Sequence, residues 1–271
     1  HIDRIRNKLI YSTNIRTRSD VSLGSFLSSG IDSNSIVSIQ NQKLKKNFNT
    51  FSIFDKKSKR DESSLIKRIV EKNNYKNISI DASKIDIFET LKKTIKYHNA
   101  PVFTLNSLIQ SHLFKKIKSK KIRVMLSGIG SDEIFAGYYD HFLYHLKDQI
   151  KKKEYDKNFN FFNKFIKKKI NNKKINDLQN LKKLPFSRIS LTDTYEKLIK
   201  SKKIKLPSIK KFSGKSNLHT ALISQLNENL SPALYLEDLN SMMYSIEVRS
   251  PFLSKDLVEK MFSINSNNLI E

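Results

Sequence analysis

The sequence has no cysteine and no tryptophan, and it contains only 6 glycines and 5 prolines among its 271 residues. The absence of cysteine excludes disulfide bonds, thiolate metal sites and a cysteine nucleophile within this stretch. The low glycine and proline content excludes collagen-like and low-complexity chains. No apolar run reaches the ~18 residues that a membrane-spanning helix needs. The chain is therefore expected to be a globular protein of the cytoplasm, without a membrane partner.

Positive charge is what the sequence has in excess, because 51 Lys and Arg face 26 Asp and Glu and give a net charge of +25. Such a balance can indicate nucleic-acid binding. Most of the excess is lysine, however, and it accompanies abundant asparagine and isoleucine, as an AT-rich genome would supply. Because the lysines are spread along the chain, we favour this compositional explanation and do not expect nucleic acid as a partner.

Apolar patterns predict an alternation of helices and strands over the first half of the chain. A helix with an apolar stripe is expected over about residues 3–13. Short, largely apolar strands are expected over residues 21–27, 49–54, 78–80 and 122–126. Helical spacing follows each of the first two strands and recurs over residues 86–97 and 104–118. This alternation predicts an α/β fold with a twisted parallel sheet, helices on both faces and right-handed crossovers.

The pattern changes at about residue 141, after which strand signals vanish. Residues 147–230 are expected to form a Lys-rich helical insertion, and residues 230–264 to form further helices. Four phenylalanines stand between the charges of the insertion: Phe159, Phe161, Phe162 and Phe165. Two interpretations are open, a mobile helical insertion or a basic and aromatic surface that would bind RNA through phosphates and stacking.

The first candidate site is a polar turn directly after the first strand, with the sequence Leu27-Ser28-Ser29-Gly30-Ile31-Asp32-Ser33. Backbone amides of such a turn, serine hydroxyls and the following helix N-terminus favour a bound anion. Asp32 would repel a phosphate unless it held a divalent cation that the phosphate shares. The alternative is an ordinary helix cap made by Asp32 or Ser33.

A second turn of the same kind ends the fourth predicted strand, with the sequence Ser127-Gly128-Ile129-Gly130-Ser131-Asp132-Glu133. Parallel strands present their carboxyl ends at one edge of the sheet, so Asp32 and Asp132 are expected to converge on one cation. The alternative is that Asp132 and Glu133 only favour a helix N-terminus, each by ~0.3–1 kcal/mol.

A third stretch, residues 236–253, places Glu237, Asp238, Glu247 and Arg249 in a mainly apolar setting. Taken alone, it is typical of a capped helix followed by a turn that Pro251 stops.

Together with Asp61-Glu62-Ser63 after the second strand, these stretches resemble, in order, the motifs of the synthetase domain of the glutamine-dependent asparagine synthetases. The resemblance spans the chain and implies one synthetase domain over residues 1–271 with an adenine-nucleotide α-hydrolase-like fold. It further implies an AMP-forming ligase that uses ATP and Mg²⁺ to convert aspartate to asparagine through β-aspartyl-AMP. The ammonia would come from glutamine in a glutaminase domain expected upstream of His1. A homodimer is one possible assembly.

The resemblance also assigns roles to individual positions. Asp32 and Asp132 match the Mg²⁺ ligands, Glu133 and Arg249 match the substrate side of the cleft, and Ile129 stands where the family has Glu or Gln. The positions that match the ATP site are Leu27, Ser28, Ser29, Gly30, Asp32, Ser33, Ile53, Ser127 and Gly128.

The sequence departs from the family pattern at several positions. Ser29 replaces the first glycine of the loop, Asn99 begins a segment that is usually Asp-Glu-Pro, and Ser254 replaces an aspartate. Ile129 can do neither acid–base nor hydrogen-bond chemistry, and a family lysine is expected only beyond the last residue of this stretch. The resemblance therefore supports ATP binding more strongly than aspartate turnover. The alternatives are an amidotransferase of surface-polysaccharide synthesis acting on another carboxylate, a tRNA-modifying ATP pyrophosphatase, and a degenerate domain without catalysis.

Overall fold

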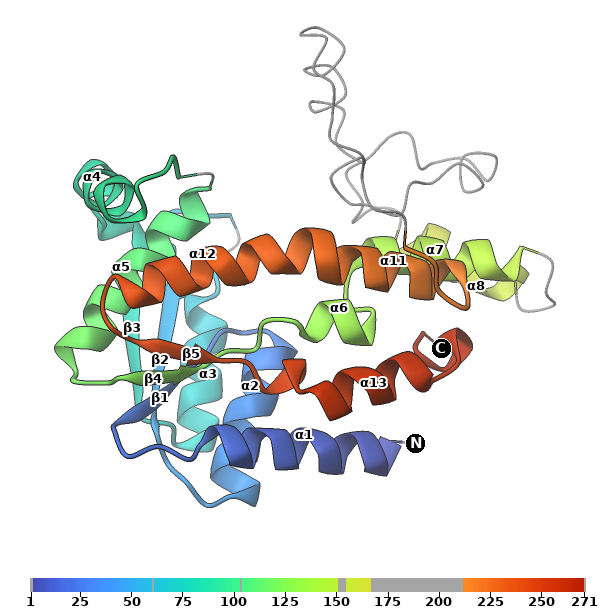
Figure 1. Cartoon of the computed structure of the whole chain (residues 1–271), viewed down its shortest axis with the longest axis horizontal. Helices are drawn as coiled ribbons and strands as arrows, with labels where there is room; N and C mark the ends of the chain where they lie inside the picture. The colour runs from blue at the N-terminus through green and yellow to red at the C-terminus, as the bar shows by residue number, and fades with distance from the viewer. Residues whose placement is uncertain (1, 60, 103, 151–154, 167–211, 271) are drawn as a thin grey trace, which may run out of the picture. The chain divides into compact units, whose positions relative to one another are not determined.

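The computed structural model describes residues 2–59, 61–102, 104–150, 155–166 and 212–270. Its centre is a five-stranded sheet in the order β3-β2-β1-β4-β5, in which every neighbouring pair is parallel (Figure 1). The strands are β1 (Leu23–Phe26), β2 (Asn49–Phe54), β3 (Asn77–Asp81), β4 (Val124–Leu126) and β5 (Glu247–Arg249). The predicted parallel α/β fold is confirmed.

The chain divides into two compact units, and the sheet lies in the first, which comprises His1–Ile129 and Ala233–Val258. The helices that lie wholly in this unit are α1 (Ile2–Arg16), α2 (Ile31–Ser38), α3 (Ser63–Asn73), α4 (Ile87–His98) and α5 (Leu105–Ser119). Two more helices run across the division in sequence: α12 (Ser231–Met242) and α13 (Lys255–Ser263).

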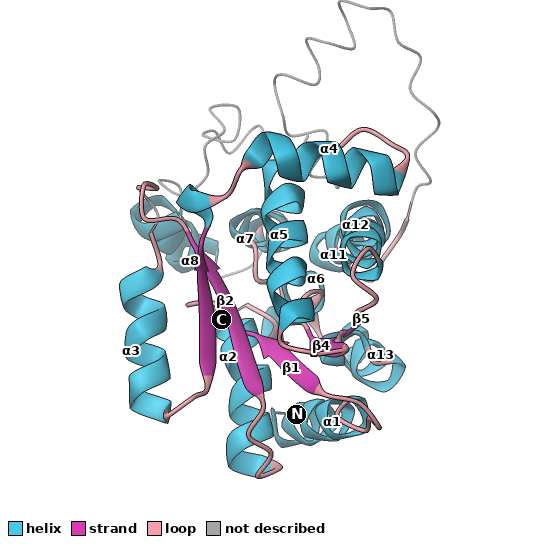
Figure 2. Cartoon of the chain, turned by 90° about the vertical axis from the view of Figure 1, so that its left-hand side faces the viewer, coloured by secondary structure: helices cyan, strands magenta, loops and turns pink. Residues whose placement is uncertain are grey.

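Helices cover both faces of the sheet, as the alternating pattern predicts (Figure 2). On one face, Phe26 of β1 meets Phe114 of α5 edge to face, with their ring centroids 5.6 Å apart. On the other face, Ser25 Oγ donates to Gln40 Oε1 at 2.7 Å in the π-helical turn that follows α2. Val70 of α3 packs on the same side against buried Leu27 and Val37. Successive side chains of β1 thus contact elements on opposite faces of the sheet, as the period-two alternation of a strand requires.

The ends of the helices account for one departure from the family pattern. Asp86 begins α4 by accepting the amide of Glu89 at 2.9 Å, and Asn99 ends it in the left-handed region at φ 50°. Asparagine adopts this conformation more readily than most residues. Asn99 is therefore a helix-ending residue in this chain.

The second unit, comprising Gly130–Pro232 and Glu259–Glu271, is helical where the structure describes it. Its helices are α6 (Ser131–Phe135), α7 (Tyr139–Gln149), α8 (Tyr155–Phe161) and α11 (Asn217–Gln225). Leu143 and Leu146 of α7 are fully buried against Leu218 of α11. Asp148 fixes the start of α11 by accepting the amides of Asn217 at 2.7 Å and Leu218 at 3.0 Å. The extent of the insertion, 147–230, stays a prediction, because residues 151–154 and 167–211 lie outside the described part.

The aromatic-surface interpretation of this segment is wrong for Phe162. Its side chain is only 3% exposed and stacks on Phe142, with the ring centroids 6.2 Å apart. Phe159 packs on the same cluster, whereas Phe161 is 47% exposed. The side chain of Phe165 lies outside the described part. Phe162 is thus a core residue and offers no face for stacking on a base.

Some boundaries differ from those that the sequence predicts. The first helix is longer, Ile2–Arg16, and the first strand is shorter, Leu23–Phe26, although the amide of Leu27 still donates to Phe51 O at 2.9 Å. The expectation that strands end before residue 141 is wrong, because β5 pairs with β4 at the edge of the sheet. Its three residues are half-buried or exposed and carry two charges, so β5 lacks an apolar pattern. Within the described residues no helix combines the length and apolarity needed to cross a bilayer.

Candidate functional site

The polar turn after β1 is tied together by its own serine hydroxyls. The amide of Ser28 donates to Ser33 Oγ at 3.0 Å, and the two hydroxyl oxygens lie 2.9 Å apart. The amide of Gly30 donates to Ser28 Oγ at 3.1 Å. The turn leads directly into α2, and the first amides of an α-helix are the groups that can receive an anion. The sequence motif therefore forms a preformed loop at the carboxyl end of a central strand.

The backbone of this loop explains why serine is tolerated where the family has glycine. Ser29 is not among the residues with positive φ, so the strain considered for a serine at this position does not arise. Gly30 is extended, with φ −72° and ψ 155°. A Cβ on Gly30 would lie 3.2 Å from Ser28 Oγ. Glycine at position 30 thus leaves room for the Ser28 hydroxyl rather than permitting an unusual φ.

Glu62 reaches this loop and was not predicted as a site residue. Its Oε2 accepts the amide of Ser29 at 3.2 Å, and it stands directly before α3. The Glu62 carboxylate therefore accepts the hydrogen of one amide that could otherwise bind an anion. The signal was present in the sequence, because Glu62 belongs to the Asp61-Glu62-Ser63 motif, but 33 positions separate it from Ser29.

The second motif meets the first at Gly128. A Cβ built on Gly128 would lie 3.1 Å from both Asp32 Cβ and Ser33 N. This spacing is tighter than ordinary van der Waals contact, so only glycine lets the two turns approach so closely. The parallel pairing of β1 with β4, in which Ser25 stands opposite Leu126, brings the two turns to the same sheet edge. In the first unit, Gly128 of the second turn thus lies directly against Asp32 and Ser33 of the first turn.

A buried carboxylate supports the second turn from α12. Glu237 is 6% exposed, and its Oε1 accepts the Ser127 hydroxyl at 3.3 Å and Gln110 Nε2 at 3.0 Å. The pKa of Glu237 is raised to about 7, mainly by burial; the hydrogen bonds from Ser127 and Gln110 oppose this rise, and the nearby charge of Asp238 adds to it. A carboxyl group that titrates near neutral pH beside a ligand-binding loop is typical of functional sites. From the sequence alone, Glu237 stands out only as an acid in a mainly apolar stretch.

The other residues predicted for the ATP site lie around the same edge. Leu27 is 2% exposed and packs with Val37 of α2. Ile53, on β2, packs against the cluster that contains Phe114. Asp32 lies half-buried in the first turn of α2. Their contacts with a nucleotide stay predictions.

The acidic pair of the second motif lies in the second unit and is held by its own segment. Tyr138 donates its phenolic hydrogen to Glu133 Oε1 at 2.7 Å, and Glu133 is only 5% exposed. A Cβ on Gly137 would collide with the carboxylate of Asp132. At the end of the motif, Gly137 therefore leaves room for the Asp132 carboxylate, and Tyr138 binds Glu133. Because Asp32 belongs to the first unit, its convergence with Asp132 on one Mg²⁺ stays a prediction. Among the described residues, no three His, Asp or Glu side chains gather as a ready metal site.

Arg249 lies beside the second turn through its backbone, since its carbonyl accepts the amide of Ser127 at 2.9 Å. Its guanidinium is engaged elsewhere. It bonds Glu247 Oε1 at 2.8 Å and donates to the carbonyls of Arg16 at 3.0 Å and Arg18 at 2.6 Å. These bonds fasten β5 to the end of α1, and the predicted contact of Arg249 with substrate stays untested.

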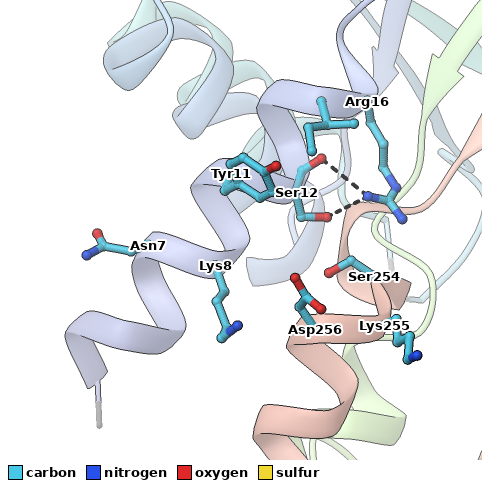
Figure 3. A pocket seen from close by; sticks show the side chains of 9 residues that line it. Asn7, Lys8, Tyr11, Ser12, Arg16, Ser254, Lys255 and Asp256 are labelled. Carbon is cyan, nitrogen blue, oxygen red and sulfur yellow. Dashed lines mark hydrogen bonds between the residues drawn. The ribbon is translucent and has the colours of Figure 1, made fainter.

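A separate cavity of about 410 Å³ lies between α1 and the start of α13 (Figure 3). Ser254, the position where the family has aspartate, lies on its wall together with Arg16 and Asp256. Ser12, which also lines the cavity, donates to Pro251 O at 2.6 Å and accepts from Arg16 Nη1 at 2.8 Å. Burial and the neighbouring Arg249 lower the pKa of Arg16. None of the motif residues of the two turns lines this cavity.

Comparisons with known proteins agree with the motifs. The family model described as asparagine synthase matches residues 4–271. Asparagine synthetase [glutamine-hydrolyzing] 1 of Bacillus subtilis is 32% identical over 137 residues, which are 51% of this chain and 21% of that protein. A putative asparagine synthetase [glutamine-hydrolyzing] 2 of Methanocaldococcus jannaschii is 34% identical over 54% of this chain and 28% of its own length.

Two further proteins are similar to parts of this chain. Amidase chyE of Penicillium rubens is 27% identical over 51% of this chain and 22% of its own length. An NH3-dependent NAD synthetase from Campylobacter jejuni superposes with a TM-score of 0.36 at 17% identity, over 77% of this chain and 98% of that chain. The matched part of this chain thus spans between 21% and 28% of the length of these curated relatives.

Proposed function

Because the chain belongs to the asparagine synthase family, we propose that it activates a carboxylate with ATP and transfers the acyl group to ammonia, which gives an amide. The single observation that carries the assignment to this site is the packing of Gly128 against Asp32 and Ser33. It unites the two family motifs at the carboxyl end of the central strands, where open α/β sheets bind ligands.

The chemistry has two steps, and the first uses the loop after β1. An oxygen of the substrate carboxylate attacks the α-phosphorus of ATP, and the bond to pyrophosphate breaks. The amides that begin α2, with the hydroxyls of Ser28 and Ser33, would stabilise the charge of the departing pyrophosphate. Carboxylate and phosphate oxygens are ligands that Mg²⁺ prefers, so Asp32 suits a Mg²⁺ ion that would neutralise part of this charge.

In the second step ammonia attacks the acyl carbon, AMP leaves with the electrons of the C–O bond, and the nitrogen loses a proton. The contribution of the protein is mainly positioning, because AMP is already a good leaving group. The named relatives from Bacillus and Methanocaldococcus are glutamine-hydrolysing. We therefore propose glutamine as the ammonia source, hydrolysed by a glutaminase domain outside this sequence.

Aspartate is the first candidate for the carboxylate, because the two asparagine synthetases are 32% and 34% identical to the matched parts of this chain. A second candidate is a different carboxylate, as in an amidotransferase of surface-polysaccharide synthesis. Ile129 favours this second candidate, since it places an apolar side chain where the family has Glu or Gln.

The test is the exchange of labelled pyrophosphate into ATP by the full-length protein, measured without ammonia. Exchange that depends on aspartate supports the first candidate, and exchange that depends on another carboxylate supports the second. A protein that binds ATP but shows no exchange with any carboxylate would instead be the degenerate domain considered above. Steep salt-dependent binding of tRNA without exchange would favour a tRNA-modifying enzyme.

A further inference from the structure

A continuous chain of hydrogen bonds connects the second turn with the interior of the first unit. The amide of Ile129 donates to Ser127 Oγ at 3.3 Å, and the Ser127 hydroxyl donates to Glu237 Oε1 at 3.3 Å. Gln110 Nε2 donates to the same carboxylate oxygen at 3.0 Å, and Gln110 Oε1 accepts from Asn240 Nδ2 at 3.1 Å. This series of hydrogen bonds joins α5, the turn after β4, and α12, which are far apart in sequence.

The far end of this chain is anchored in the core. Asn240 is completely buried, and its Nδ2 also donates to the carbonyl and the hydroxyl of Ser107, both at 3.0 Å. Because Asn240 donates to Gln110, the amide of Gln110 is oriented with its nitrogen toward Glu237. Two donors therefore converge on one oxygen of Glu237, and a carboxylate is the group that accepts both without donating in return.

We infer that ionised Glu237 is a positioning residue for the nucleotide site, because it holds Ser127 and thereby fixes the turn that packs Gly128 on the loop after β1. The hydrogen bond that joins Glu237 to the second turn is the one from Ser127, so we assign its action to that hydroxyl. The groups that shift its pKa, besides burial, are Ser127, Gln110 and the charged Asp238. This inference rests on the proposed function only where it predicts an effect on nucleotide binding.

Protonation of Glu237 weakens this contact. A proton on Oε2 leaves Oε1 as a neutral acceptor, and a hydrogen bond to a neutral oxygen is weaker than one to an ionised carboxylate. The bond from Ser127 is then weaker, and Ser127 in turn holds the amide of Ile129. We therefore expect the turn to report on the charge of Glu237 even without a nucleotide.

The first measurement follows the backbone amide of Ile129 by NMR in the full-length protein labelled with ¹⁵N-isoleucine. In the wild type, this amide shift should titrate with a midpoint near pH 7, where the pKa of Glu237 lies. In Glu237→Gln, the titration should vanish, because the side chain keeps an acceptor oxygen but no longer changes charge. A titration that persists in Glu237→Gln would overturn the inference.

The second measurement is calorimetric binding of Mg·AMPCPP, an ATP analogue, between pH 6 and pH 8.5. Wild-type affinity should rise about fivefold to tenfold as Glu237 ionises, which is the net size of one ordinary hydrogen bond. The affinity of Glu237→Gln for Mg·AMPCPP should not change over this pH range. Ser127→Ala should bind weakly at every pH, and the double variant should lose no more than Ser127→Ala alone. Glu71→Gln, the same substitution at an exposed carboxylate of α3, is the control and should leave the profile unchanged.

The outcomes separate the two proposals. If AMPCPP binds and its pH profile is the same in Glu237→Gln, the positioning role falls and the proposed function stands. If no nucleotide binds at any pH while the Ile129 amide still titrates with Glu237, the proposed function falls, whereas the coupling of Glu237 to the turn stands. Losses in the double variant that equal the sum of the single losses would show that Glu237 does not act through Ser127.

Discussion

Gly128 and Asp32 lie so close together that a methyl group on the glycine would come within 3.1 Å of Asp32 Cβ. The two residues are 96 positions apart in sequence, and each belongs to a separate motif. Their contact is what converts two polar turns, each of which could be an ordinary helix start, into one site.

Gly128→Ala should weaken nucleotide binding by at least tenfold, because the added methyl group must push the turn away from Asp32 and Ser33. Overpacking of this kind typically also costs about 1–3 kcal/mol of folding free energy. Gly24→Ala is a matched control, because its Cβ would lie 2.9 Å from Met125 Sδ and 3.1 Å from Asn49 O within the sheet. It should lower the free energy of unfolding by a similar amount but change the affinity less. Equal losses of affinity in both variants would show that the effect is on the fold alone.

Glu62→Gln should bind metal-free pyrophosphate about threefold or more tightly than the wild type, since a carboxylate near the loop repels the anion. The variant retains an oxygen that can accept the Ser29 amide, so the loop should keep its shape. Isothermal titration with pyrophosphate in EDTA is the measurement. The control is Asp61→Asn, because Asp61 instead bonds the amide and hydroxyl of Ser63 at 2.9 and 2.7 Å. An identical gain in Asp61→Asn would indicate a general charge effect rather than the contact at Ser29.

The parallel sheet and the meeting of the two turns could be predicted because each depends on local signals. Apolar strands that end in turns rich in serine and glycine can be identified from the sequence, and parallel strands bring their carboxyl ends to one edge of the sheet. β5 could not be predicted, because a three-residue strand with two charges carries no periodic pattern. Its place is fixed by pairing with β4, where Leu126 stands opposite Arg249.

Hydrogen bonds between residues far apart in sequence could not be predicted either. The bond between Ser127 and Glu237 spans 110 positions, and the cap that Asp148 gives to α11 spans 69. Both acids could equally well be solvated surface residues when the sequence is read alone. The burial of Phe162 against Phe142 could not be predicted either, because polar and charged residues surround it in sequence. The burial of one face of a helix depends on packing partners that local composition does not reveal.

Glu237→Gln should stabilise the protein at pH 8 and leave stability nearly unchanged at pH 4. Burial raises the pKa of Glu237 from 4.5 to about 7, so the folded state favours the protonated form. The stability that this preference contributes is fully present below pH 4.5 and is lost as pH rises through about 7. At one pKa unit per 1.36 kcal/mol, the shift corresponds to roughly 3 kcal/mol. Thermal or urea unfolding of both proteins between pH 4 and pH 8 measures the difference. Parallel curves across this range would contradict the buried carboxylate.

The same substitution should therefore improve stability and impair the pH response of nucleotide binding. A side chain that opposes folding when charged, and is nevertheless placed against a motif serine, is the pattern expected where function sets the residue. The two effects are separable, because unfolding reports the cost of burying the charge and binding reports the position of the turn.

Asp32→Asn should abolish the Mg²⁺ dependence of ATP binding, because an amide oxygen is a weaker ligand for the ion than a carboxylate. Asp132→Asn should do the same if both acids serve one ion. Binding of ATP with and without Mg²⁺ in each variant is the measurement. The control is Asp20→Asn, an exposed acid before β1 that belongs to none of the motifs. Unchanged Mg²⁺ dependence in Asp32→Asn would contradict its role, and a loss confined to Asp32→Asn would remove Asp132 from the ion.

Ile129→Glu should raise aspartate-dependent pyrophosphate exchange if aspartate is the substrate, because it restores the acidic side chain that the family places at this position. Ile129 is half-buried and its amide is held by Ser127 Oγ, so the backbone of the turn should survive the exchange of its side chain. The matched variant Ile129→Gln introduces the same shape without charge and should restore less. Rates are compared at saturating ATP, so that a change in nucleotide affinity does not mimic a change in chemistry. A variant that binds ATP normally and gains no exchange with aspartate would instead favour a different carboxylate, whose apolar part Ile129 contacts.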